Sequence, residues 1–239
     1  MNTSAELGLF GFSFQPNGKL ERLTIHGGPN LLYESTRPVE MAPGRFYTPA
    51  GWDECFPTIE PAENYPVMGD LVGLPPRIEV QPELIRQTWR AARFHAARIF
   101  RLEAPHILRV DFQALNVSDS PQPVLWANHI LWATGNLRRV ALSDGSALAG
   151  FEMDGSERKW FLPAVEPTAL EYPNLTLTLT TDQPWWGIWW DKGGWPADSP
   201  GVYNCLGVEA TNTPGEVPAE DWLAPGGAFE GWVRLAVER

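Results

Sequence analysis

Two ionisable side chains interrupt otherwise apolar stretches of this sequence. His129 lies within VLWANHILW, and Glu209 lies within NCLGVEATN. A lone histidine in such a stretch is by default a core residue, and a buried carboxylate is costly unless it has partners. A glutamate paired with a histidine is also a common way to build an acid and a base that work near neutral pH. These two residues are therefore candidates for proton-transfer chemistry.

Tryptophan is the second unusual feature, with 12 in 239 residues. Its indole has a large apolar face and one N–H donor, which suits the C–H face of a sugar ring. Large aromatic side chains are mostly buried, so we expect about 70% of the tryptophans in the core or under loops. Several of them cluster, namely Trp126, Trp132, Trp185, Trp186, Trp189, Trp190 and Trp195.

Apolar and polar residues alternate with period two along most of the chain, which is typical of half-buried strands. The clearest case is LTLTLTT at 175–181. Other predicted strands lie within 7–14, 106–118, 123–134, 185–191, 202–210 and 230–238. Turn-forming pairs such as Asp144-Gly145 separate them. This pattern predicts an all-β chain that folds as an antiparallel sandwich.

The segment 82–104 conflicts with this pattern, because its many Ala and Arg residues favour a helix. Its second half can nevertheless be read as alternating, although Arg98 interrupts one face. We therefore expect strands here, with the arginines on a solvated face.

Length and composition exclude several classes of protein. A chain of 239 residues with 44% hydrophobic and 20% charged residues suits one globular domain, residues 1–239. The 22 glycines and 23 prolines argue against a helical bundle. A net charge of −11 argues against nucleic acid, anionic membranes and phosphorylated substrates as partners.

Targeting and redox signals are sparse. The N-terminus lacks the positive region of a signal peptide, and no apolar run approaches the about 20 residues that span a bilayer. Cys55 and Cys205 do not make a disulfide framework, and neither CxxC nor HExxH occurs. We therefore expect a cytoplasmic protein with free thiols.

Six segments follow one another along nearly the whole chain in the order of a known superfamily. They are GGPNLL at 27–32, AGWDECFP at 50–57, LWANHILW at 125–132, GIWWDKGGWP at 187–196, LGVEATNTPGE at 206–216 and LAPGGAFEGWVRLAV at 223–237. In this respect the chain resembles the aldose 1-epimerase (galactose mutarotase-like) superfamily. The resemblance implies a supersandwich fold and a carbohydrate-binding domain.

The resemblance also implies a mechanism, in which sugar anomers interconvert through the open-chain form without a metal or cofactor. Glu209 would be the base, and His129, with an ordinary pKa near 6.5, would be the acid. The sugar contacts it suggests are Trp52, Asp70, Asn128, Trp132, Trp190, Asp191 and Arg45. We expect His129 and Glu209 to face one cleft, lined by at least two of Trp52, Trp132, Trp190 and Trp195.

One departure from the family keeps an alternative open. The family commonly has a second histidine after the Phe-Pro element, whereas this chain has none between His26 and His95. Asp70 lies in that vicinity, but a carboxylate cannot replace a cationic donor. The alternative functions are a non-catalytic carbohydrate-binding or sugar-sensing domain and an interaction domain that binds no sugar. The sequence predicts neither the sugar nor the oligomeric state.

Overall fold

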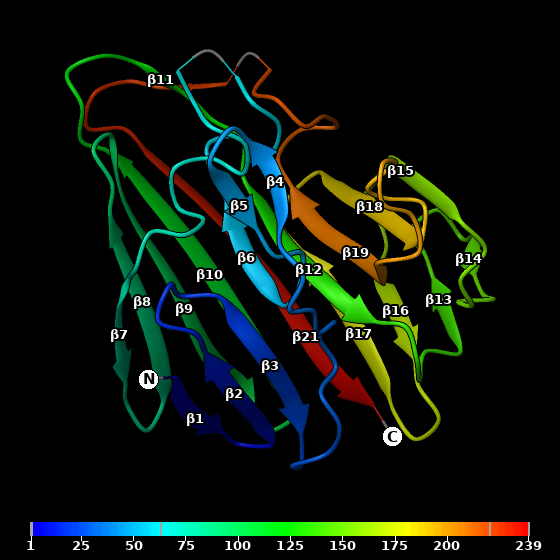
Figure 1. Cartoon of the computed structure of the whole chain (residues 1–239). Helices are drawn as coiled ribbons and strands as arrows, with labels where there is room; N and C mark the ends of the chain where they lie inside the picture. Colours follow the sequence, from blue (N-terminus) through cyan, green and yellow to red (C-terminus); the bar gives the residue numbers. More distant parts are fainter. Residues whose placement is uncertain (1, 63, 220, 239) are drawn as a thin grey trace.

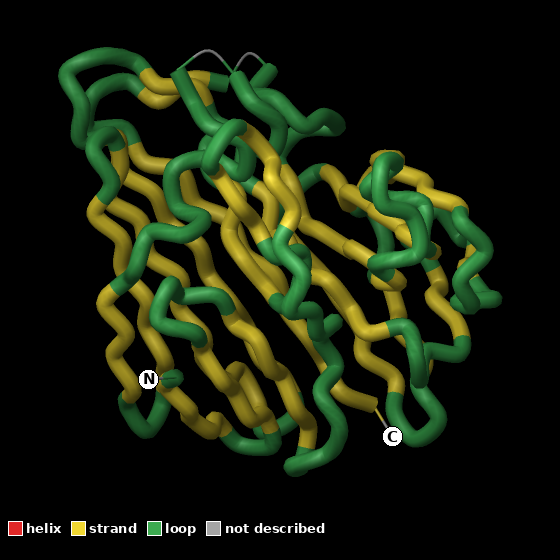
Figure 2. The backbone as a smooth tube through the Cα atoms, viewed as in Figure 1, coloured by secondary structure: helices red, strands yellow, loops and turns green. Residues whose placement is uncertain are grey.

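Strands make up the regular structure of this chain. The computed structural model describes residues 2–62, 64–219 and 221–238, and no helix occurs among them (Figure 2). Two large sheets lie face to face (Figure 1), and the named strands pair antiparallel throughout. The predicted antiparallel β-sandwich is therefore confirmed. Within the same residues, no helix is long and apolar enough to cross a membrane.

The first sheet has eight strands in the order β1-β2-β3-β6-β12-β19-β18-β15. Their bounds, in that order, are Thr3–Leu7, Phe10–Phe14, Leu20–Ile25, Trp52–Cys55, Ala127–Ala133, Asn204–Thr211, Trp185–Lys192 and Ser156–Pro163. The second sheet has nine strands in the order β14-β13-β16-β17-β21-β10-β9-β8-β7. Their bounds are Ala147–Leu148, Arg139–Ala141, Thr168–Glu171, Thr176–Thr181, Ala228–Glu238, Ile107–Asn116, Phe94–Ala104, Leu84–Arg90 and Arg77–Val80.

Two short hairpin-like pairs complete the described strands. They are β4 (Val39–Ala42) with β5 (Arg45–Tyr47), and β11 (Gln122–Pro123) with β20 (Trp222–Leu223). The β4–β5 pair lies beside β6 and β12 on the outer side of the eight-stranded sheet (Figure 1).

The core between the sheets is built from the apolar positions of the alternating strands. In β17, Leu177 and Leu179 are fully buried, while the threonines beside them are partly exposed. In β2, Phe12 stacks on Phe14, and Phe100 from the opposite sheet meets both rings at a steep angle. Because apolar burial contributes about 25 cal/mol per Å², this shared face holds the two sheets together.

The segment 82–104 forms β8 and β9, so its alternation was the better guide than its helix propensity. The expectation that its arginines are solvated is wrong for Arg98, which is 1% exposed between the sheets. Arg98 pairs with Glu54 at 3.0 Å and donates to Gln87 at 2.7 Å. Such pairing is what a buried guanidinium requires.

Candidate functional site

A row of side chains crosses the outer face of the eight-stranded sheet. The register of β12 against its neighbours puts His129 opposite Asp53 on β6 and opposite Glu209 on β19. The row continues through Gly187 on β18 to Phe161 on β15. Period two fixes which residues share this face, because alternate side chains of a strand point to opposite sides of its sheet.

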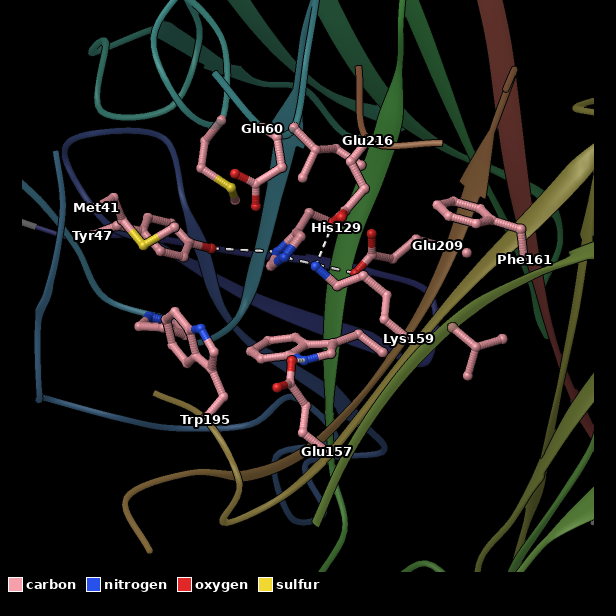
Figure 3. A pocket seen from close by; sticks show the side chains of 16 residues that line it. Met41, Tyr47, Glu60, His129, Glu157, Lys159, Phe161, Trp195, Glu209 and Glu216 are labelled. Carbon is pink, nitrogen blue, oxygen red and sulfur yellow. Dashed lines mark hydrogen bonds and ion pairs between the residues drawn. The ribbon is translucent and has the colours of Figure 1, made fainter. Parts of the chain in front are cut away.

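His129 and Glu209 lie side by side at the floor of a pocket (Figure 3). Nε2 of His129 is 3.6 Å from Oε1 of Glu209, and the two side chains are only 8% and 7% exposed. This distance is too long for a hydrogen bond. Glu209 Oε1 has no other hydrogen-bond partner. Glu209 therefore has hydrogen-bonding capacity that the protein itself does not use.

The pocket is small, with a cavity of about 80 Å³ that opens to solvent at its mouth. Apolar side chains form much of its wall, among them Met41, Met68 and Ile59. Trp189 and Trp195 meet at right angles, with ring centroids 5.5 Å apart. They provide an aromatic corner on which an apolar ligand face can rest.

The charged lining is mostly acidic. Glu60, Glu157, Glu209 and Glu216 line the pocket, and the single cation among the lining residues is Lys159. Lys159 forms an ion pair with Glu216. Glu157 accepts a hydrogen bond of 2.8 Å from the indole N–H of Trp189. The pocket therefore disfavours a phosphorylated or otherwise anionic ligand.

Burial moves the pKa values of the facing pair in opposite directions. It raises the pKa of Glu209 from 4.5 to about 8, although Lys159 opposes this. It lowers the pKa of His129 from 6.5 to about 4, although Asp53 opposes this. The expected ordinary histidine pKa is thus wrong, because the imidazole is desolvated. These directions favour a neutral imidazole on His129 and a protonated carboxyl on Glu209 near neutral pH.

Three polar residues lie behind His129. The Tyr47 hydroxyl is 3.3 Å from His129 Nδ1 and donates to Asp53 Oδ2 at 3.1 Å. The ammonium of Lys19 is 2.8 Å from the same Asp53 oxygen. All four residues are buried.

Three of the expected sugar contacts lie on the opposite side of the sheet. Trp52, Trp132 and Asn128 are fully buried on the core side, and none of them lines the pocket. They share period-two positions that alternate with His129 and Asp53, so their side chains point between the sheets. Trp190 also misses the pocket, because it packs on Phe151.

The other expected contacts do not line the pocket, and each has a structural partner. Asp70 forms an ion pair of 3.1 Å with Arg93, and Arg45 donates to the Gly69 carbonyl at 3.0 Å. Asp191 accepts backbone N–H bonds from residues 193, 194 and 195, which fixes the loop that carries Trp195. Of the four tryptophans expected in the cleft, only Trp195 lines it, so the expectation of two was wrong.

Sequence reasoning missed the rest of the lining, above all Tyr47, Lys159 and Glu216. Lys159 carried a usable signal, because Glu157, Lys159 and Phe161 share one face of a strand. Tyr47 and Glu216 lie far from His129 in the sequence, and no local pattern joins them to it. Among the described residues, no group of three or more His, Cys, Asp or Glu side chains could hold a metal ion.

No protein-family model and no curated protein sequence matches the chain. Solved structures do match it over its whole length. A galactose mutarotase related enzyme from Lactobacillus acidophilus is 12% identical, with a TM-score of 0.72 and coverage of 100% of this chain and 98% of that one. A galactose mutarotase-like protein from Lactobacillus casei is 13% identical, with a TM-score of 0.70 and coverage of 100% of both chains.

An aldose epimerase homologue from C. elegans is 12% identical, with a TM-score of 0.58 and coverage of 100% of this chain and 99% of that one. At such identities the likeness is one of architecture, and it agrees with the two facing antiparallel sheets described above. The chain therefore has the fold of the galactose mutarotase-like proteins.

Proposed function

We propose that this protein interconverts the α and β anomers of an unphosphorylated aldose by acid–base ring opening. The observation that carries the proposal is the His129–Glu209 pair, two buried groups 3.6 Å apart at the floor of one pocket. The opposite pKa shifts leave one group able to accept a proton and the other able to donate one near neutral pH.

Ring opening needs two proton transfers. Neutral His129 accepts the proton of the anomeric hydroxyl through Nε2, and the Glu209 carboxyl donates its proton to the ring oxygen. The bond from C1 to the ring oxygen breaks as the C1 carbonyl forms. After rotation about the C1–C2 bond, the same transfers run in reverse and close the ring as the other anomer. This assignment reverses the roles that the family resemblance implies, because the proton rests on Glu209.

The remaining lining suits a neutral sugar. Trp189 and Trp195 offer aromatic faces for the C–H side of the ring. Carboxylates of the lining, such as Glu60, can accept hydrogen bonds from hydroxyl groups. The same carboxylates repel a phosphate.

A carbohydrate-binding or sugar-sensing domain without turnover is the alternative. The observation that favours it is that His129 is the one histidine among the pocket's lining residues. Such a domain would bind the sugar on the same aromatic corner but would not accelerate ring opening.

Polarimetry of freshly dissolved α-glucose and α-galactose, with the buffer-catalysed rate subtracted, tests the proposal. Titration calorimetry with the same sugars measures binding independently. Acceleration that saturates with sugar concentration supports the epimerase. Binding without acceleration supports the sensing domain, and neither binding nor acceleration across a broad panel of aldoses rejects both sugar functions.

A further inference from the structure

A chain of buried polar groups leads away from His129 on the side opposite Glu209, and Figure 3 shows its first member, Tyr47. It runs from His129 Nδ1 to the Tyr47 hydroxyl, then to the Asp53 carboxylate and to the Lys19 ammonium. Each step is 3.3 Å or shorter. A buried chain of this kind restricts where each proton can sit, because every donor needs an acceptor.

Lys19 fixes the far end of the chain. An ammonium has three N–H donors, and Lys19 has three acceptors, namely Asp53 and the carbonyls of Thr48 and Ala50. Its Nζ also lies 4.3 Å from the centroid of the Tyr47 ring. The paired Asp53 is therefore a carboxylate, which accepts hydrogen bonds and donates none.

Tyr47 then has only one arrangement that satisfies both of its neighbours. Its hydroxyl has a single proton, and the charged Asp53 carboxylate is the stronger acceptor, so that proton points to Asp53 Oδ2. The Tyr47 oxygen can therefore only accept from His129 Nδ1. This requires the proton of the neutral imidazole to sit on Nδ1.

The groups on the other side of His129 do not compete for this proton. Glu209 Oε1 from β19 is 3.6 Å from Nε2 and outside hydrogen-bond distance. The Trp189 ring from β18 lies 6.3 Å away. The nearby cation is Lys159 from β15, which is already paired with Glu216 and disfavours a positive imidazole.

We propose that Tyr47, Asp53 and Lys19 are positioning residues that hold His129 in the Nδ1–H tautomer, with the unprotonated Nε2 turned to the pocket as the proton acceptor. The tautomer itself follows from the buried contacts alone. Its kinetic consequence rests on the proposed epimerase function, because an accepting Nε2 matters only if a sugar hydroxyl is deprotonated there.

Nuclear magnetic resonance of ¹⁵N-histidine-labelled protein tests the tautomer directly. The chain has only 4 histidines, and the signal that His129→Asn removes identifies His129. At a pH between the two values of about 4 and about 8, we expect a protonated Nδ1 and an unprotonated Nε2 in the wild type. A wild type in which Nε2 holds the proton would overturn the proposal.

Two variants test which residues hold the tautomer. Tyr47→Phe removes the acceptor of the Nδ1 proton, so the two tautomers should mix. Asp53→Asn removes the charged acceptor, so the Tyr47 proton can turn to Nδ1 and the Nε2–H form should rise. Either variant decides the question if the other does not fold. A tautomer unchanged in every variant that folds would show that the chain does not hold it.

Tyr65→Phe is the matched control. Tyr65 is buried, and its hydroxyl donates to Gln122 outside the pocket lining. This variant loses one buried hydrogen bond but should leave the His129 tautomer unchanged. An equal change in Tyr65→Phe and Tyr47→Phe would contradict a specific role for Tyr47.

Kinetics provide the second readout. Tyr47→Phe should lower kcat by about 10- to 100-fold with KM nearly unchanged, which is less than the full contribution of a general base. A rise in KM at constant kcat would show that Tyr47 only lines the pocket and does not position His129 for catalysis. If the wild type turns over no aldose, the proposed function fails, and the tautomer measurement still decides on the positioning residues.

Discussion

Gly207 lies two residues before Glu209 on the same face of β19, and its missing side chain leaves room for the Glu209 carboxylate. A Cβ placed on Gly207 would come 2.6 Å from Glu209 Oε1. Real Cβ atoms do not approach oxygen so closely, so the carboxylate would have to move away. The position of the proposed proton donor, Glu209, therefore depends on the glycine at 207.

Gly207→Ala should consequently displace the Glu209 carboxylate and lower kcat by about 10- to 100-fold, because small misplacements of reacting groups are costly. Gly135→Ala is the control, since a Cβ there meets nothing within 4 Å. Anomerisation rates of both variants, together with their melting temperatures, provide the check. A fully active Gly207→Ala protein would show that the position of Glu209 is not critical.

The pH dependence of the anomerisation rate should follow the shifted pKa values of His129 and Glu209. Below about pH 4 His129 gains a proton and can no longer accept one, and above about pH 8 Glu209 loses the proton that it donates. We expect a bell-shaped profile of kcat/KM with limbs near these two values. A plateau that begins only above pH 6.5, the ordinary histidine pKa, would contradict a desolvated His129.

The aromatic corner formed by Trp189 and Trp195 should affect sugar binding more than the proton-transfer step. Trp195→Ala removes one face of the corner and should raise KM by about 2- to 10-fold with little change in kcat, as expected for one stacking contact. Trp222→Ala is the matched control, because Trp222 is 60% exposed and does not line the pocket. A large loss of kcat with unchanged KM in Trp195→Ala would place the sugar elsewhere.

Glu209 should also make stability depend on pH. Its pKa in the folded protein is about 8, above its ordinary value of 4.5, so between these values the folded state binds more protons than the unfolded state. The contribution of Glu209 to the free energy of unfolding then falls as pH rises through this window, by up to about 1.4 kcal/mol per pH unit. The lowered pKa of His129 acts in the opposite direction between about 4 and 6.5, so the net fall is expected between about pH 6.5 and pH 8.

Glu209→Gln removes the contribution of Glu209 to the pH dependence of stability. The substitution leaves no former partner of Oε1 unpaired, because that oxygen has no hydrogen-bond partner. The variant should match the wild type near pH 4.5 and exceed its stability at pH 8, measured by denaturant unfolding. The exposed Glu230→Gln is the control and should show no such trend. Equal stability of wild type and Glu209→Gln at both pH values would refute an unfavourably buried carboxylate.

Local alternation in the sequence was enough to predict the fold. It assigned β17, β10 and β21, and it also decided for strands in 82–104 against the helix propensity of Ala and Arg. It failed for Arg98, because a residue's polarity does not reveal the Glu54 partner that allows its burial. Partners on distant strands depend on sheet register, which one sequence does not specify.

The contrast between local sequence pattern and distant partners also separates the residues of the site that could be predicted from those that could not. His129 and Glu209 stood out as ionisable residues in apolar strands, and the structure brings them together. Period two could have excluded Asn128, because it is the neighbour of His129 and must face the other way. Tyr47 could not be found in this way, since it approaches His129 from the separate β4–β5 pair.

The most direct measurement of the account is the anomerisation rate of Glu209→Gln beside that of the wild type and of Glu230→Gln, with sugar binding measured on all three. Glutamine keeps the shape of the side chain but cannot supply the proton, so kcat should fall by about 10²- to 10⁴-fold while sugar affinity changes little. A Glu209→Gln protein that anomerises aldoses at the wild-type rate would contradict the account.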